Sequence, residues 1–283
     1  MADNLGVGSS LQALRMRGDA RHEAEWQDGD PDYVELYSLT AAEIPALIAL
    51  ATHWVDEPPE DDAVYGPVHA WRALGQMRAL EAVQPLLDVQ DRLDDLDDDW
   101  YLDEFQHVFG LIGPPAIEAL ATFLGDDSRG EFPRASAGNG LREIAVRFPE
   151  TRQRVVRILT AELARHQKRL ATLNGFLISD LMDLEAVESA EEIERAFAAD
   201  VIDPTIAGHW QDVRQELGVP GLGIAPDWSP GWPSIRERIG FPTAGFWEVQ
   251  PSPGRTKRRD KRRQAKAKRQ QKKRDRKRSR KPH

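Results

Sequence analysis

Apolar side chains recur along this chain with the spacing of amphipathic helices, and the first clear run starts at Thr40. Residues 40–43 (Thr-Ala-Ala-Glu) have the spacing of a capping box, in which a hydroxyl and a carboxylate satisfy free backbone N–H groups. Residues 44–50 then repeat apolar side chains on one helical face. Two prolines at 58–59 end the run, since proline cannot continue a helix. The pattern predicts a helix from about residue 40 to residue 55.

Four helix pairs are predicted beyond this first helix. Equivalent points of the pairs recur about every 30–40 residues, a period typical of helical repeats. Gly75 and Gly113 are expected to end the first helices of two pairs, and Pro114 to start the second helix that follows. The predicted pairs cover residues 66–76 with 80–87, 104–113 with 114–124, 135–147 with 149–167, and 173–184 with 190–199.

A single pair cannot bury its own apolar stripe, whereas stacked pairs share one continuous core. The fold class we expect is therefore all-α, an α-solenoid of helical hairpins. A plain helical bundle, in which the similarity between hairpins is accidental, is the alternative. A last short helix is predicted at 206–217.

Two of the joints carry a family resemblance. His69-Ala-Trp-Arg-Ala-Leu-Gly75 and Phe109-Gly-Leu-Ile-Gly113-Pro-Pro-Ala-Ile-Glu-Ala-Leu120 resemble the short HEAT-like repeats named after phycobilisome lyases. The resemblance covers roughly residues 35–200. It implies a solenoid fold and, for most members of the superfamily, a scaffolding role, while a few members handle bilins. A covalent bilin needs a thiol in its acceptor. This chain has no cysteine, so it cannot carry such a chromophore.

The flanks of the repeat region lack this periodicity. Residues 1–34 are polar and aperiodic, which predicts a mobile leader before a repeat domain at 35–217. Residues 218–254 are rich in glycine, proline and tryptophan and predict an irregular extension. Residues 255–283 have almost no apolar side chains and predict a disordered basic tail.

Charge is divided unevenly between the tail and the rest of the chain. Residues 255–283 hold 18 Lys and Arg but two acidic residues, which gives the tail +16 and leaves −25 elsewhere. Such a tail binds polyanions by releasing counterions, without reading sequence. Attachment to RNA or DNA is the favoured interpretation, and a solubilising tail or one folded onto the acidic body are the alternatives. The expected contacts are Arg258, Arg259, Arg262, Arg263, Arg269 and Arg274.

The chain contains no cysteine, which excludes disulfides, thiolate metal sites and a cysteine nucleophile. No run of about 18 apolar residues is present, so no membrane span is expected. The N-terminus lacks the basic start and apolar stretch of a secretory signal. These features together suggest a cytoplasmic protein.

Possible metal ligands occur in the sequence as one run of carboxylates and as two pairs of an aspartate and a histidine. Nine carboxylates lie between Asp88 and Glu104, but their spacing does not match a calcium loop, and a solvated loop between repeats is expected. Asp103 and His107 lie four residues apart and can face the same side of a helix, and His53 and Asp56, three residues apart, form a similar pair. Neither pair supplies enough ligands, so structural or surface roles are expected.

Other catalytic and cofactor motifs are missing from the sequence. There is no Gly-x-Ser-x-Gly and no phosphate-binding loop, and the glycines at 218–223 are interpreted as a turn. Eight tryptophans are present. Trp54, Trp71 and Trp210 are expected to pack within helices. Trp228, Trp232 and Trp247 are expected to pack on the repeat surface, with stacking on a base, a tetrapyrrole or a peptide as the alternative.

The sequence therefore favours a non-enzymatic scaffold that binds a protein or peptide on its repeat surface and nucleic acid through its tail. No catalytic, cofactor-binding or metal-binding residue is assigned. The alternative is a lyase-like enzyme or enzyme subunit acting on a tetrapyrrole or a modified protein. It requires a groove lined by ionisable groups such as Asp103 and His107.

Overall fold

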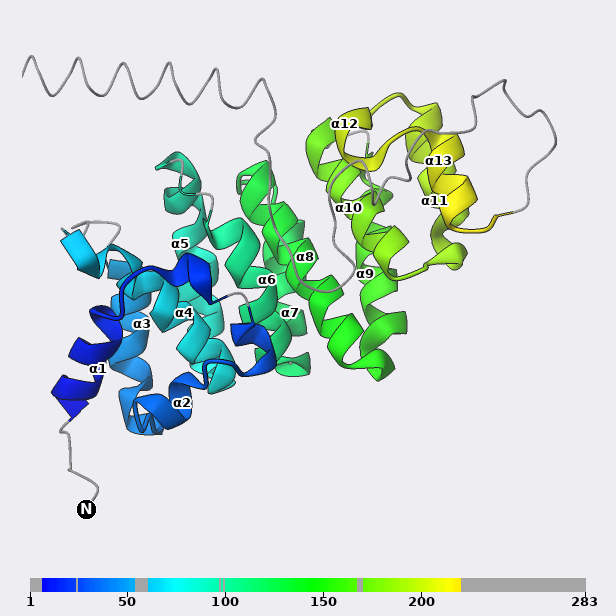
Figure 1. The fold of residues 1–283 in the computed structure, drawn as a ribbon. Coiled ribbons are helices and arrows are strands. Elements are labelled where there is room, and N and C mark those ends of the chain that lie inside the picture. The colour runs from blue at the N-terminus through cyan, green and yellow to red at the C-terminus, as the bar shows by residue number, and fades with distance from the viewer. Residues whose placement is uncertain are drawn as a thin grey trace, which may run out of the picture. The chain divides into compact units, whose positions relative to one another are not determined.

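The computed structural model describes residues 7–23, 25–53, 61–96, 98, 100–166 and 170–219, all within the first of two compact units, Met1–Ile239. Every regular element in these ranges is an α-helix or a 3-10 helix, which confirms the all-α prediction (Figure 1). No single helix there is both long enough and apolar enough to cross a membrane. The predicted tail and most of the predicted extension, residues 220–254, lie outside the described residues.

The first predicted helix is present as η3 (Ala41–Glu43) followed by α3 (Ile44–Thr52). Its capping box forms as the sequence predicted. The amide of Thr40 donates to Glu43 Oε2 at 2.6 Å, and the hydroxyl of Thr40 accepts from the amide of Ala42 at 3.3 Å. These bonds satisfy backbone groups that the start of a helix otherwise leaves free.

Four pairs follow, each a first helix joined through a short 3-10 turn to a second helix. The pairs are α4 (Gly66–Gln76) with η6 (Leu80–Ala82) and α5 (Val83–Asp95); α6 (Trp100–Ile112) with η7 (Pro114–Ala116) and α7 (Ile117–Gly125); α8 (Glu131–Arg147) with η8 (Pro149–Thr151) and α9 (Arg152–Leu163); and α10 (Ala171–Asp183) with η10 (Val187–Ser189) and α11 (Ala190–Ala198).

Consecutive pairs pack against one another in two series. The first helices contact in the order α4, α6, α8, α10, and the second helices in the order α5, α7, α9, α11. Figure 1 shows α4, α6 and α8 side by side. The apolar residues between the two series form one hydrophobic core. Beyond the pairs, α12 (Pro204–Ala207) packs on α10 and α13 (Trp210–Glu216) packs on α11.

Two local predictions need correction. Gly75 does not end its helix: α4 continues to Gln76, and Arg78 takes the left-handed conformation with φ 53°. Gly75 instead allows close packing, since a Cβ there would lie 3.2 Å from Val108 Cα. The acidic run is also not simply a loop: Asp88, Asp91, Asp94 and Asp95 lie on α5, which extends to Asp95, and Asp103 and Glu104 lie on α6.

The N-terminal region differs from the expected mobile leader. It contains α1 (Val7–Arg15) and α2 (Tyr33–Leu36), and both contact α4. From the end of α1 to Tyr33, the first residue of α2, runs a largely irregular segment with two short 3-10 helices, η1 (Ala20–His22) and η2 (Trp26–Asp28). We call this segment, residues 16–23 and 25–33, the strap. Leu14, Ala20 and Trp26 are buried in the main core, as is Tyr33. Single buried side chains separated by polar residues leave no periodic pattern, so periodicity alone did not reveal them.

Candidate functional site

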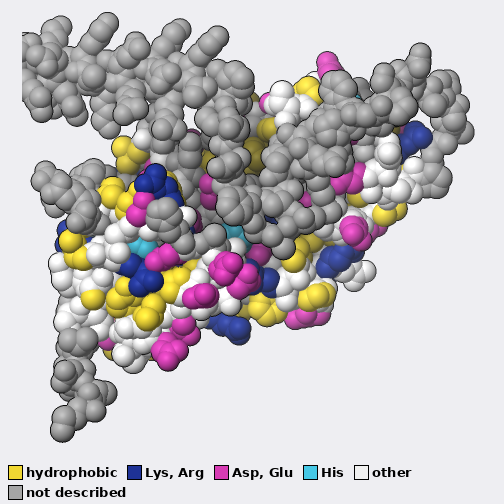
Figure 2. Space-filling model, viewed as in Figure 1, with side chains coloured by type: hydrophobic (Ala, Val, Ile, Leu, Met, Phe, Trp, Pro, Cys, Tyr) yellow, Lys and Arg dark blue, Asp and Glu magenta, His cyan; other side chains and the backbone are white. Residues whose placement is uncertain are grey.

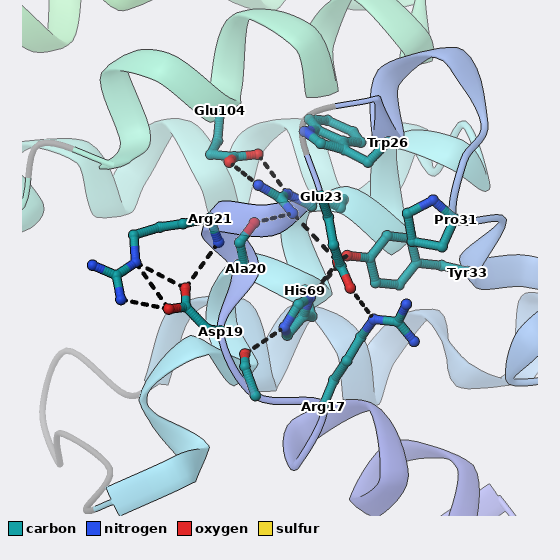
Figure 3. Close-up of polar contacts among 12 residues, drawn as sticks. Arg17, Asp19, Ala20, Arg21, Glu23, Trp26, Pro31, Tyr33, His69 and Glu104 are labelled. Carbon is teal, nitrogen blue, oxygen red and sulfur yellow. Dashed lines mark hydrogen bonds and ion pairs between the residues drawn. The ribbon is translucent and has the colours of Figure 1, made fainter. Parts of the chain in front are cut away.

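One face of α4 binds the main chain of the strap through polar side chains. His69 and Arg72 lie three residues apart, and both are buried. The Nε2 of His69 lies 3.0 Å from the carbonyl oxygen of Gly18, and Nη1 of Arg72 donates to the carbonyl oxygen of Ala20 at 3.0 Å (Figure 3). Each of these contacts depends on the backbone and not on the identity of the strap side chain.

Gln76 extends this face by one further turn of α4. Its Nε2 donates to the carbonyl oxygens of Trp26 at 2.8 Å and Pro31 at 3.0 Å. Its Oε1 accepts from the amide of Tyr33 at 2.7 Å. A side-chain amide that both donates and accepts can hold an irregular chain in the way a neighbouring strand would.

A carboxylate from the strap completes the contact with α4. Glu23 Oε1 accepts from Arg17 Nε at 2.6 Å, and Glu23 Oε2 accepts from the hydroxyl of Tyr33 at 2.5 Å and lies 3.5 Å from Arg72 Nη1 (Figure 3). Burial disfavours the charged form, but the hydrogen bonds from Tyr33 and Arg17 outweigh it and lower the pKa of Glu23. The carboxylate therefore remains ionised at neutral pH. Burial also raises the pKa of Tyr33, which stays a neutral phenol.

His69 faces the same group from α4. Its Nδ1 lies 2.8 Å from the Tyr33 hydroxyl oxygen, and its ring is fully buried. Burial, together with the nearby charges of Arg72 and Arg17, lowers the pKa of His69 despite the opposing effect of Glu23. The ring is therefore neutral at neutral pH.

Arg72 joins the strap to the next first helix. Its Nε and Nη2 bind the two carboxylate oxygens of Glu104 on α6 at 3.0 and 2.5 Å, a bidentate ion pair. The guanidinium also lies 5.4 Å from the ring of Trp26, within cation–π distance. Removing one partner of such a buried pair leaves the other charge uncompensated, so the pair makes α4, α6 and the strap interdependent.

Polar side chains also join the first helices of the later pairs, α6, α8 and α10. Nη2 of Arg142 on α8 donates to Gln106 Oε1 on α6 at 2.5 Å, and its Nε lies 3.2 Å from Asp180 Oδ1 on α10. Burial raises the pKa of Asp180 to about 8, although Arg142 opposes the shift. The carboxyl group is thus mostly protonated at neutral pH.

His107 lies beside this group, close to a carboxylate on α8. Its Nδ1 is 3.5 Å from Glu143 Oε1, which accepts from Arg147 Nε at 3.0 Å. Burial would raise the pKa of Glu143, but His107 and the neighbouring arginines outweigh it and bring the pKa to about 2. The ring of His107 thus faces α8 and lies edge-on to Trp26, while Asp103, four residues earlier on α6, is exposed.

We call these side chains together the polar row; they are His69, Arg72, Gln76, Glu104, Gln106, His107, Arg142, Glu143, Asp180 and Asp183. Acidic, basic and histidine side chains are interspersed on the face seen in Figure 2. The strap covers the α4 end of the row. The charges of the row are engaged with one another or with the backbone, so the row holds helices and an irregular segment together.

The other residues singled out in the sequence do not belong to the polar row. In the acidic run, Arg129 binds Asp91 at 3.0 Å and lies 3.6 Å from Asp88, so these two carboxylates are not simply solvated. Among the described residues, no group of three or more His, Asp or Glu could hold a metal ion. His53 is exposed. Outside the described residues lie Trp54, Asp56, Asp97, Asp99, Trp228, Trp232, Trp247 and the tail arginines Arg258, Arg259, Arg262, Arg263, Arg269 and Arg274.

Two of the tryptophans pack as expected. Trp71 is fully buried, and its Nε1 donates to the carbonyl oxygen of Ala51 at 2.9 Å. Trp210 is partly buried, with its ring 5.9 Å from that of Phe197. Both side chains stabilise the helix packing.

The sequence interpretation missed the strap residues Glu23, Trp26 and Tyr33. A usable signal was present on α4 itself, where His69, Arg72 and Gln76 place three polar side chains on one face of an otherwise apolar helix. A polar face on a buried helix requires polar partners, since unpaired buried polar groups are costly. The signal shows that a partner exists but does not identify which segment supplies it.

Comparison with known proteins gives no further identification: no protein family, curated protein or solved structure matches this chain.

Proposed function

We propose that this protein is a helical-repeat scaffold of the HEAT-like kind, a solenoid whose first helices form the binding face. Two observations support the solenoid interpretation: the first helices pack in one series and the second helices in another, and each pair repeats the same helix, 3-10 turn, helix order. The function is binding and positioning of a partner.

The observation that carries this proposal is the recognition of the strap by α4. His69, Arg72 and Gln76 bind four carbonyl groups and one amide of an irregular segment, largely without regard to its side chains. Backbone recognition supplies affinity, while anchors such as Trp26 and Glu23 supply specificity. We infer that the partner is an irregular or extended peptide segment that binds as the strap does.

A peptide competition experiment tests this inference. The full-length Trp26→Ala variant, in which the strap loses its buried anchor, is titrated with a labelled synthetic peptide of residues 16–33. The peptide should bind this variant measurably and the wild-type protein at least about tenfold more weakly, because the intact strap occupies the same face at high effective concentration. A peptide carrying Glu23→Ala and Trp26→Ala is the control. Equal binding of both peptides would refute the role of Glu23 and Trp26 as anchors, and binding of neither peptide would refute recognition of the strap backbone by α4.

We also propose that the basic tail attaches the scaffold to nucleic acid. The tail's net charge of +16 supports an electrostatic mode. In the full-length protein, the six arginines named above are replaced by glutamine, and binding to labelled RNA and duplex DNA is measured across a salt series. Six lost phosphate contacts should reduce the slope of log affinity against log salt by up to about five.

The matched control replaces the same six arginines by lysine, which keeps the charge. The lysine variant should retain most of the salt dependence of the wild type. An unchanged slope in the glutamine variant, or no binding by the wild type, would remove nucleic acid from the proposed function.

A further inference from the structure

The strap is held on α4 by a compact group of charged and titratable residues. Around His69 these are Glu23 and Arg17 from the strap, Tyr33 at the start of α2 and Arg72 on α4, with Glu104 of α6 paired to Arg72 beyond. Groups from the strap, α2 and α4 therefore converge on one buried imidazole. A change of charge at that ring acts on every contact that fixes the strap.

The neutral group has fewer hydrogens than acceptor atoms that need one. Nε2 of His69 faces the carbonyl oxygen of Gly18, which only accepts, so Nε2 carries a hydrogen. Tyr33 has one hydroxyl hydrogen for two neighbours, Glu23 Oε2 at 2.5 Å and His69 Nδ1 at 2.8 Å. While the ring is neutral, that single hydrogen serves only one of them. A proton added at Nδ1 would complete both bonds.

The added proton has an opposing electrostatic effect. It would create a third cation beside Arg17 and Arg72, against the two carboxylates of Glu23 and Glu104, in a site where the ring has no exposed surface. Burying an incompletely compensated charge costs more than one hydrogen bond between uncharged partners contributes. The lowered pKa of His69 agrees with this, because it shows that the site disfavours the protonated ring.

We propose that this group is a proton-sensitive latch, which holds the strap on α4 at neutral pH and releases it on mild acidification. Release uncovers the backbone-binding side chains of α4, and the consequence for a partner rests on the proposed function. The latch itself concerns the strap alone. It is therefore tested by a measurement that needs no partner.

The sign of the pH dependence follows from linkage. Because the pKa of His69 is lower with the strap docked than in the exposed ring, docking is strongest above the ordinary value of 6.5 and weakens as pH falls below it. Glu23 also has a lowered pKa, but from an ordinary value of 4.5, so it stays ionised at pH 5.5. Between pH 7.5 and pH 5.5, the charge of this group therefore changes at His69 and not at Glu23.

Hydrogen exchange measured by mass spectrometry on the full-length protein provides the test. Protection factors of peptides covering residues 16–33, each corrected for the intrinsic exchange rate at that pH, should fall by up to about tenfold between pH 7.5 and 5.5. Peptides from α8 and α9 should not lose protection. His69→Gln, which keeps a neutral donor and acceptor, should abolish this pH dependence, whereas His53→Gln, at an exposed histidine, should retain it.

An NMR titration of the histidine ring nitrogens in the wild-type protein covers the case in which His69→Gln does not fold. One buried histidine should titrate below 6.5 together with the loss of strap protection. Protection that stays constant, or that increases at pH 5.5, overturns the latch. Neither result bears on peptide binding at pH 7.5, so failure of the latch and failure of the proposed function are distinguishable.

Discussion

Single glycines set how closely the first helices approach. At Gly110 on α6, a Cβ would overlap Glu143 Cγ and lie 3.2 Å from Arg147 Nε. Gly110→Ala should therefore lower the free energy of unfolding by about 1–3 kcal/mol, because the ion pair on α8 must move. Urea unfolding measures this. Gly125→Ala is the matched control: nothing lies within 4 Å of its Cβ position, so a helix-favouring gain of about 0.5 kcal/mol is expected. Equal effects at the two sites would contradict the close approach.

Asp180 gives a second prediction at the scale of one residue. Its pKa of about 8 in the folded protein exceeds its ordinary value of 3.8, so the folded state holds a proton that the unfolded chain releases. Stability should therefore fall as pH rises through this window. Asp180→Asn imitates the protonated carboxyl group and should gain about 1 kcal/mol relative to wild type per pH unit between pH 5 and 8.

Urea unfolding of both proteins at pH 5, 6.5 and 8 measures that gain. Asp88→Asn, at a half-exposed carboxylate, serves as the control and should shift stability by a similar small amount at every pH. A constant difference between Asp180→Asn and wild type would show that the carboxyl group is ionised in the folded state.

Whole elements were predictable to the extent that their apolar side chains were periodic. The helix pairs from α4 to α11 follow a 3.6-residue pattern and lie where the sequence predicts them, but α5 extends eight residues beyond its predicted end and α6 and α8 each begin four residues earlier than predicted. Gly75 was misassigned because glycine ends helices and also permits close helix packing, and the sequence does not distinguish the two uses. The strap was missed because Glu23, Trp26 and Tyr33 are held by tertiary hydrogen bonds, which have no local signature.

Trp26→Ala tests whether the strap is an integral element. Trp26 is almost fully buried, with the Arg72 guanidinium 5.4 Å from its ring and His107 edge-on to it, so its removal should lower the free energy of unfolding by about 3–5 kcal/mol. Met16→Ala, at a side chain that is 46% exposed, is the control and should cost less than about 1 kcal/mol. A negligible effect of Trp26→Ala in chemical unfolding would restore the interpretation of this region as a mobile leader.

At the scale of the whole molecule, the site was only partly predictable. The tail's function was inferred from composition, which needs no fold. The polar row instead depends on which helices become neighbours: Arg142 on α8 meets Gln106 on α6 and Asp180 on α10, residues 36 and 38 positions away. Sequence periodicity places each residue on a helix face, but only the packing order of the pairs brings these faces together.

The opposite charges of the tail and the remaining chain lead to a final prediction. A tail of +16 and a remainder of −25 attract each other over roughly the Debye length, about 10 Å at 0.1 M salt and about 3 Å at 1 M. The radius of gyration of the full-length protein, measured by small-angle X-ray scattering, should therefore increase when the salt is raised from about 0.05 M to about 1 M NaCl. Replacing the six tail arginines by glutamine lowers the tail charge to +10 and should reduce the increase, while lysine replacements should preserve it. If the radius does not change with salt in any variant, the tail is not attracted to the acidic body, and its positive charge is free for nucleic acid at every ionic strength.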